Sequence, residues 1–279
     1  MAIGVFITFK LLDYADLTVD GSIATGGAVC VMLILAGWNP ILALLMAFLA
    51  GCCAGLITGL LHTALGIPAI LSGILTQLAL YSVNMRIMGK SNQAVSVDKV
   101  ELLLSSRYNV TAILVSGAVV VAVIALLYWF FGTELGCAIR ATGSNPDMSR
   151  AQGINTGRNK VIGLALSNGL VGLAGGMLAQ YSGAADVKMG QGAIVIGLAA
   201  VIIGDVVFGK LFRNFGLRML GVALGAVLYY IVIAAVVRMG LSNTDLKMFS
   251  AIVVAVFLSV PHFREKLGTR KRREVAKNA

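Results

Sequence analysis

The stretch GCAIRATGSNPDMSRAQGINTGRNK, residues 136–160, decides how the rest of the sequence is interpreted. It is a long internal segment that is polar, basic and rich in turn residues, and apolar runs flank it on both sides. Its basic residues, Arg140, Arg150, Arg158 and Lys160, outnumber its carboxylates. Because basic residues near the ends of membrane spans stay on the cytoplasmic side, the stretch predicts a cytoplasmic loop between two spans.

Within this loop the sequence predicts one short helix over residues 146–152. Asn145 marks a turn before it, and proline suits the first helical position. Gly153 can end the helix in the left-handed conformation. Asp147 near the start and Arg150 near the end complement the helix dipole. The pattern is typical of a short surface helix held between two spans, where it can pass a displacement to the spans.

The composition places the chain in the membrane. Of 279 residues, 58% are hydrophobic and 12% are charged, against about 25% charged residues in soluble domains. The chain also has 33 glycines, which allow apolar helices to pack closely. We therefore expect an all-α, polytopic transmembrane bundle forming a single domain over residues 1–279. The net charge of +10 lies in loops and tail, so it indicates topology and attraction to anionic lipid rather than nucleic-acid binding.

The apolar runs predict eight membrane spans, or nine when residues 1–12 are counted. Residues 1–12 would form a helix of about 18 Å, short of the roughly 30 Å hydrocarbon core, so we expect a truncated first span. The basic tail, residues 262–279, is expected in the cytoplasm, which places the N-terminus outside. The other predicted spans are 21–37, 39–62, 67–88, 109–131, 161–182, 194–208, 219–237 and 247–261.

Residues 13–22, DYADLTVDGS, interrupt the apolar pattern with three aspartates and a glycine. One interpretation is a short acidic loop. The other is an interrupted helix whose polar groups line a solute path, because polar groups at membrane depth must face protein or a wet cavity. The candidate pathway residues on this segment are Asp16, Thr18, Asp20 and Ser22.

The predicted span 67–88 carries a polar stripe at helical spacing. The stripe can hydrogen-bond across the bundle or line the pathway, and Thr76, Gln77 and Asn84 are its candidate pathway residues. The preceding span carries Gly51, Gly55 and Gly59 on one face, which predicts close approach of a neighbouring helix.

Two features near residue 205 bear on catalysis. Asp205 is a lone carboxylate near a span end, either solvated at the interface or buried and functional. Residues 204–211, GDVVFGKL, resemble a phosphate loop, but Leu211 stands where Ser or Thr must hold magnesium. We therefore expect no ATPase motif, no enzyme activity and no cofactor or metal in this chain.

The central loop and the span after it, residues 136–184, resemble the coupling region of bacterial ABC-importer permeases of the branched-chain amino acid and ribose type. Met148 and Ser149 replace the usual paired alanines of that family. The early stretch ADLTVDGSIATGGAV resembles a further family element, with Asp20 inserted. This element is closest to a subgroup encoded with a lipoprotein and associated with amino acids of the tryptophan or tyrosine type. The residues that match the loop pattern are Arg140, Ala141, Gly143, Asn145, Ala151, Gly153, Ile154 and Asn155.

The resemblance implies a permease in the bacterial cytoplasmic (inner) membrane that imports a small polar solute, most simply an amino acid. Its expected partners are two ABC ATPase subunits that bind ATP and Mg²⁺, a second permease copy forming a homodimer, and an extracytoplasmic solute-binding lipoprotein. The alternatives are import of a sugar or nucleoside within the same family, and an ion-coupled secondary transporter. The expected ATPase-coupling residues are Arg140, Gly143, Asn145, Pro146, Arg150, Ala151, Gly153 and Ile154.

Overall fold

The computed structural model describes residues 1–95, 102–107, 109–209, 211–212 and 214–238, together with residues 248, 251–252, 254–255 and 259. Most of the predicted span 247–261 and all of the tail 262–279 lie outside the described residues. The chain divides into two compact units, Met1–Ile194 (unit 1) and Val195–Ala279 (unit 2). That the chain forms a single domain stays a prediction.

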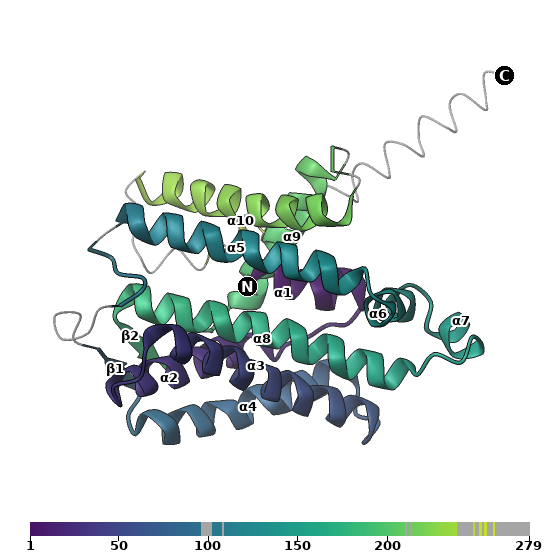
Figure 1. The fold of residues 1–279 in the computed structure, drawn as a ribbon, viewed down its shortest axis with the longest axis horizontal. Coiled ribbons are helices and arrows are strands. Elements are labelled where there is room, and N and C mark those ends of the chain that lie inside the picture. The colour runs from purple at the N-terminus through teal and green to yellow at the C-terminus, as the bar shows by residue number, and fades with distance from the viewer. Residues whose placement is uncertain are drawn as a thin grey trace. The chain divides into compact units, whose positions relative to one another are not determined.

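Unit 1 is a bundle of helices (Figure 1). Two short strands, β1 and β2, pair antiparallel with Asn92 opposite Asp186. Helix α9 (Ala193–Phe208) begins at the end of unit 1 and continues into unit 2, which also contains α10 (Phe215–Arg238). The other elements are α1 (Ala2–Phe6), the π-helix η1 (Ile7–Leu11), α2 (Val19–Leu35), α3 (Pro40–Thr63), α4 (Ala69–Met88), β1 (Asn92–Ala94), α5 (Asn109–Phe131), α6 (Glu134–Ser144), α7 (Pro146–Ala151), α8 (Thr156–Ser182) and β2 (Ala184–Asp186).

The predicted helical membrane bundle is confirmed. Among the described residues, α3, α5, α8 and α10 are long and apolar enough to cross a membrane, and shorter apolar helices cover Ala2–Leu11, α2 and α9. Helix α8 differs clearly from its predicted boundaries, because it begins at Thr156 instead of residue 161. The Asn155 side chain accepts a hydrogen bond from the backbone N–H of Arg158 and caps this earlier start.

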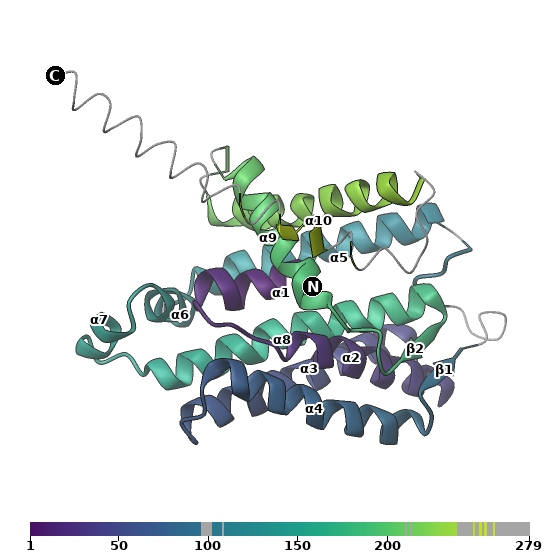
Figure 2. The ribbon, with the colours of Figure 1, turned by 180° about the vertical axis from the view of Figure 1, so that it is seen from behind.

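Helix α8 lies at the centre of unit 1. It packs against α2 and α3, and also against α1 and α6. Figures 1 and 2 show it running between α1 and α3 from both sides. Helix α8 therefore positions α1, α2, α3 and α6 directly, whereas α4 packs on α2 and α3.

Glycines allow α3 and α8 to approach at backbone distance. A Cβ atom on Gly51 would overlap the carbonyl oxygen of Asn168, and one on Gly55 would overlap that of Leu164. Gly59 lies against Val161, so its Cβ would be 2.9 Å from the Val161 Cα. The predicted close-packing face of α3 is thus confirmed, and α8 is the helix it meets.

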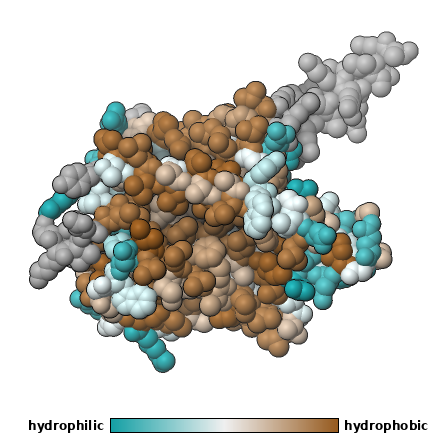
Figure 3. All heavy atoms as spheres, viewed as in Figure 1, coloured by the Kyte–Doolittle hydropathy of each residue, from teal (hydrophilic) through white to brown (hydrophobic). Residues whose placement is uncertain are grey.

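The outer faces of the helices carry large apolar side chains. Leu45 and Leu49 on α3, Leu78 on α4 and Leu114 on α5 are all about half exposed or more. In the view of Figure 3, hydrophobic residues cover the helices of unit 1, and hydrophilic residues gather at the end formed by α6 and α7. This distribution suits helices whose outer faces contact lipid or another apolar surface.

In unit 2, α9 and α10 also meet through glycine, since a Cβ on Gly225 would overlap the Ala200 carbonyl oxygen. Residues 204–208, the first part of the apparent phosphate-loop match, are the last turn of α9 and not a loop. Asp205 is exposed on this helix, and Lys210 lies outside the described residues.

We expect Gly55→Ala to destabilise the protein, because the added methyl must push α3 away from the Leu164 carbonyl. Overpacking of this kind costs about 1–3 kcal/mol. The matched control is Gly117→Ala on α5, where nothing lies within 4 Å of an added Cβ. The melting temperature in detergent should fall for Gly55→Ala and stay level or rise for Gly117→Ala. Equal melting temperatures would mean that this contact does not limit stability.

Candidate functional site

A break between two helices lies inside unit 1. The first helical segment ends at Leu11, and α2 begins only at Val19. Between them the side chains alternate: Tyr14, Asp16 and Thr18 are buried, whereas Asp13 and Ala15 are exposed. The segment is thus an interruption between helices whose polar side chains point into the protein, and not a wholly surface-exposed acidic loop.

Asp16 is the centre of this break. Its Oδ2 atom accepts a hydrogen bond from Nδ2 of Asn168 at 2.6 Å, and its Oδ1 atom accepts from the backbone N–H of Thr18 at 2.9 Å. The Asn168 Oδ1 atom accepts in turn from the Ser22 hydroxyl at 2.6 Å. Asp16 is the one charged residue that is buried among the described residues, and 2% of its surface is exposed. A buried carboxylate is tolerated only where such donors surround it.

Hydroxyl groups join the same break to α3 and α4. The Thr18 and Thr58 hydroxyls lie 2.7 Å apart, and Thr58 donates to the Thr76 hydroxyl at 2.9 Å. The Tyr14 hydroxyl lies 2.7 Å from that of Ser72. The break is therefore hydrogen-bonded to α3, α4 and α8 at once.

The predicted pathway residues fall into three groups. Asp16, Thr18, Ser22 and Thr76 lie together in this network, in which Asn168 and Thr58 connect their hydrogen bonds. Gln77 is partly buried where α4 meets Gly21, and Asn84 is buried further along α4 with neither amide atom paired. That these residues line a solute path stays a prediction.

Asp20 lies apart from the network. Its two carboxylate oxygens accept hydrogen bonds from the backbone N–H groups of Gly192 and Ile194, each at 2.9 Å. These N–H groups lie at the start of α9, where a negative charge is favourable. The side chain thus holds a later segment of the chain.

Three members of the site were missed in the sequence: Tyr14, Thr58 and Asn168. Thr58 and Asn168 are polar residues within apolar runs, which was the available signal. Nothing local in the sequence indicates that Asn168 meets Asp16, because the contact joins residues 152 positions apart.

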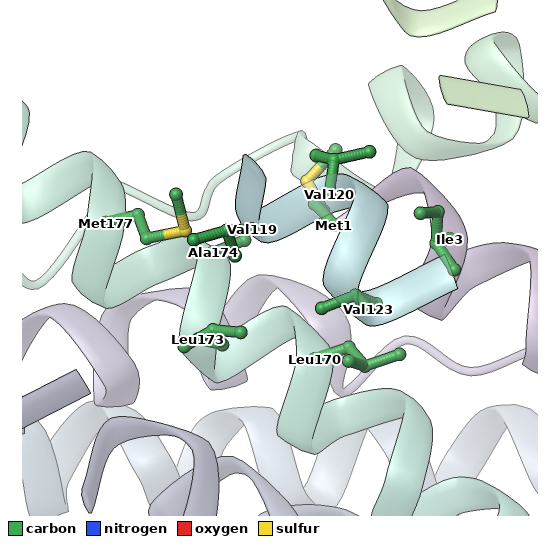
Figure 4. A pocket seen from close by; sticks show the side chains of 9 residues that line it. All are labelled: Met1, Ile3, Val119, Val120, Val123, Leu170, Leu173, Ala174 and Met177. Carbon is green, nitrogen blue, oxygen red and sulfur yellow. The ribbon is translucent and has the colours of Figure 1, made fainter. Parts of the chain in front are cut away.

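A separate hollow lies between α5 and α8. A cavity of about 60 Å³ is lined by apolar side chains only (Figure 4), among them Met1, Val123 and Leu170. It borders a groove of about 610 Å³ that also includes Asn109, Ser116 and Tyr181. Its largely apolar lining suits hydrocarbon, so it is a poorer candidate for a polar solute than the break.

At the polar end of unit 1, α7 has a cap at each end. The Asn145 Oδ1 atom accepts from the backbone N–H of Met148 at 3.0 Å. Gly153 has a φ of +79°, and the backbone N–H of Ile154 donates to the Ser149 carbonyl at 3.0 Å. This is the Schellman arrangement that ends a helix. The predicted short helix is confirmed, one residue shorter than expected.

Helix α7 stands outside the packed bundle, at one extremity of unit 1 in Figures 1 and 2. Ser149 is its one buried residue, and Met148 has 58% of its surface exposed. Arg150 lies 3.7 Å from Asp147, and both side chains are largely exposed. The helix therefore presents an accessible surface of mixed polarity.

The base of α7 is joined to the bundle on two sides. Arg150 donates from Nε to the Thr156 hydroxyl at 3.1 Å, which joins α7 to α8. Asn159 donates to the Thr142 hydroxyl at 3.0 Å, which joins α8 to α6. A Cβ on Gly143 would overlap the Leu11 carbonyl, so α6 packs directly on the end of η1.

The predicted coupling residues therefore divide between two helices. Two of them lie on α6, where Arg140 is exposed and Gly143 has a packing role that the sequence did not reveal. Those on α7 or at its caps are Asn145, Pro146, Arg150, Ala151, Gly153 and Ile154.

His62 joins the polar end to the break. Its Nδ1 atom lies 2.8 Å from the Ile67 carbonyl and its Nε2 atom 3.4 Å from the Lys160 Nζ atom. These partners fit a neutral ring that donates from Nδ1 and accepts at Nε2. The ring also packs edge-on against Tyr14, with centroids 5.1 Å apart. The start of α8 is thus linked through His62 to the segment that carries Asp16.

We expect Asp16→Leu to destabilise the protein more than Asp16→Asn. Leucine leaves the Thr18 N–H and the Asn168 amide without a buried acceptor, and each such loss costs about 1–3 kcal/mol. In Asp16→Asn, the amide oxygen can still accept from the Thr18 N–H. If the Asn168 amide flips, its oxygen can accept from the NH₂ group that the substitution introduces. Melting temperatures in detergent should rank wild type, then Asp16→Asn, then Asp16→Leu. The reverse order of the two variants would contradict this hydrogen-bond assignment.

The chain is similar to several permeases of known transport systems. The tyrosine transport system permease protein of Clostridioides difficile (strain R20291) is 40% identical over 259 residues, covering 93% of this chain and 86% of that protein. The autoinducer 2 import system permease protein LsrC of Yersinia pseudotuberculosis (serotype O:3, strain YPIII) is 30% identical over 190 residues, covering 67% and 53%. The fructose import permease protein FruF of Bifidobacterium longum (strain NCC 2705) is 25% identical over 268 residues, covering 94% and 74%. No solved structure gives a significant match.

The family comparison covers both units. The model of the family described as "Branched-chain amino acid transport system / permease component" matches residues 1–261. That range includes the break around Asp16, the capped helix α7 and the central helix α8. The chain therefore belongs to this family of ABC-transporter permeases, and it is an integral membrane protein.

Proposed function

We propose that this chain is the membrane subunit of an ATP-driven importer that moves an amino acid, with tyrosine as the first candidate. Two copies would form the path in the bacterial cytoplasmic membrane. Two ABC ATPase subunits would bind on the cytoplasmic side, and an external lipoprotein would deliver the solute. The single observation that carries the proposal is α7, a short exposed helix capped at both ends.

The caps explain how so short a helix can transmit force. An isolated helix of six residues is not stable in water, but Asn145 and Gly153 satisfy its end groups. The exposed Met148 suits an apolar contact on an ATPase surface, and Arg150 provides a charge beside it. Closure of the ATPase pair would then move α7 as one body.

The contacts at the base of α7 give the motion a route into the bundle. Arg150 bonds to the first residue of α8, and α6 packs through Gly143 on the end of η1. The break around Asp16 begins immediately after η1. Movement of α7 would therefore act on both sides of the break, and transport follows where ATP binding favours one arrangement over the other.

The solute assignment rests on the relatives. The name of the C. difficile protein indicates tyrosine transport, and its 40% identity extends over 93% of this chain. Sugar import remains the alternative within the family, since FruF is named as a fructose permease. A scarcity of buried charge suits a permease whose specificity comes from the external binding protein.

The alternative of another class is an ion-coupled secondary transporter. Such proteins place carboxylates at paired positions to bind the coupling ion. The carboxylates of Asp16 and Asp20 are hydrogen-bonded to groups of the protein itself. This favours a structural use of both residues over ion coupling.

We expect Met148→Glu to reduce co-purification of the partner ATPase at least tenfold, because it puts a charge where we propose that Met148 makes an apolar contact with the ATPase. The side chain is exposed, so the melting temperature of the permease should not change. The measurement is a detergent pull-down of the tagged chain from its native host.

The control is Leu65→Glu, an equally exposed apolar residue in the turn between α3 and α4. It should leave ATPase co-purification unchanged. Undiminished ATPase binding by Met148→Glu would remove α7 from the docking surface. Isolation of the wild-type chain with no ATPase, still competent for ion-driven uptake, would overturn the ABC mechanism.

The solute is tested by uptake. Proteoliposomes that contain the purified permease–ATPase complex, ATP inside and the lipoprotein outside should accumulate radiolabelled tyrosine. Unlabelled tyrosine or phenylalanine should compete, whereas fructose should not. Accumulation of fructose but not tyrosine would replace the amino acid by a sugar and leave the ATP-driven mechanism standing.

A further inference from the structure

The chain turns back into the bundle after α8. Residues 187–192 follow β2 and return along α2 toward its start. The Met189 side chain packs on Gly27, where an added Cβ would lie 2.6 Å from the Met189 sulfur. Gly190 lies against the Asp20 carbonyl oxygen. Gly27 and Asp20 are seven residues apart on α2, so the Met189 side chain and the Gly190 backbone together contact about 10 Å of the α2 axis.

The segment ends near the middle of the bundle. Ser22, half a turn beyond Asp20, hydrogen-bonds to Asn168. Asn168 lies about 18 Å from the start of α8 and about 21 Å from its end along the helix axis. The backbone N–H groups held by Asp20 are therefore near mid-depth of a membrane-spanning helix.

Polar groups of this segment are exposed at that depth. Gln191 and Gly192 are exposed, and Gly192 has a φ of +84°, so the backbone there is irregular. Irregular backbone cannot face lipid, because hydrocarbon offers no hydrogen-bond partner to its N–H and C=O groups. Asp20 itself is only partly buried, and Lys188 is exposed earlier on the same segment. These features fit a wet surface.

We propose that Gln191 and Gly192 face the water-filled path of the permease, and that Asp20 is the positioning residue that holds them there. This rests on the proposed transport function. The carboxylate of Asp20 is engaged by two backbone N–H groups, so its part is to position the path wall and not to bind the solute. The path-facing residue with a side chain able to contact a polar solute is Gln191.

Cysteine accessibility tests the first part. In a background with Cys30, Cys52, Cys53 and Cys137 replaced by alanine, Gln191→Cys is treated with a charged methanethiosulfonate reagent in permeabilised membrane vesicles. The thiolate that reacts forms only in contact with water. The matched control is Leu49→Cys, which is exposed on α3 about half a turn from the contact between Gly51 and Asn168.

We expect Gln191→Cys to be labelled at least tenfold faster than Leu49→Cys. Equal rates would overturn the proposed path surface. The labelling needs no knowledge of the solute, so rapid labelling without tyrosine uptake would refute only the proposed solute. Slow labelling with normal uptake would refute only the path surface.

The role of Asp20 is tested in the same cysteine-free background that carries Gln191→Cys. Asp20→Ala removes both acceptors and should change the labelling rate of Gln191→Cys at least threefold. Asp20→Asn keeps one acceptor oxygen and should change it less, and this variant serves if Asp20→Ala does not fold. The control is Thr25→Val on α2, whose hydroxyl bonds only within its own helix. An unchanged rate in both Asp20 variants would overturn the positioning role.

Discussion

The hydrogen bond from Asn168 to Asp16 is the interaction on which the arrangement of unit 1 depends. A chain that leaves the helical conformation inside a membrane bundle must find partners for its freed backbone groups, since lipid provides none. Asp16 accepts from the Thr18 N–H and anchors the break to the central helix in one step. Without it, the break between η1 and α2 would place unpaired groups in an apolar interior.

The glycine contacts between α3 and α8 set the other constraint. In lipid, helices gain little from hiding apolar surface, so their association depends on close packing and hydrogen bonds. Glycines at residues 51 and 55 bring the α3 backbone onto α8 at the level of Asn168 and Leu164. The same α8 residues thus take part in helix packing and in the polar network. A shift of α8 cannot leave the break unchanged.

Local features were predictable from the sequence, and long-range ones were not. The apolar runs, the short helix α7 and its Gly153 cap depend on neighbouring residues, and within the described residues up to 238 the structure places them within about five residues of the prediction. The Asn168 partner of Asp16 and the Gly192 partner of Asp20 lie more than 150 positions away. Gly143 is assigned to the coupling motif because the loop resembles that of a known family. Its contact with Leu11 could not be predicted in this way, because it follows from how α6 packs.

These constraints together explain why a push on α7 would reach the path under the proposed mechanism. Helix α7 is too short to bend, and it is joined at its base to α8 and through α6 to η1. Helix α8 is a regular α-helix, and η1 is a short π-helix that continues α1, so a displacement can pass along each of them. The non-helical segment between η1 and α2 is the break around Asp16, which is also hydrogen-bonded to α8, so under the proposed mechanism differential movement of α8 and η1 would be absorbed there. Under this proposal the polar network would accommodate a change of state, because hydroxyl hydrogen bonds such as those joining Thr18, Thr58 and Thr76 can exchange partners without opening a packed interface.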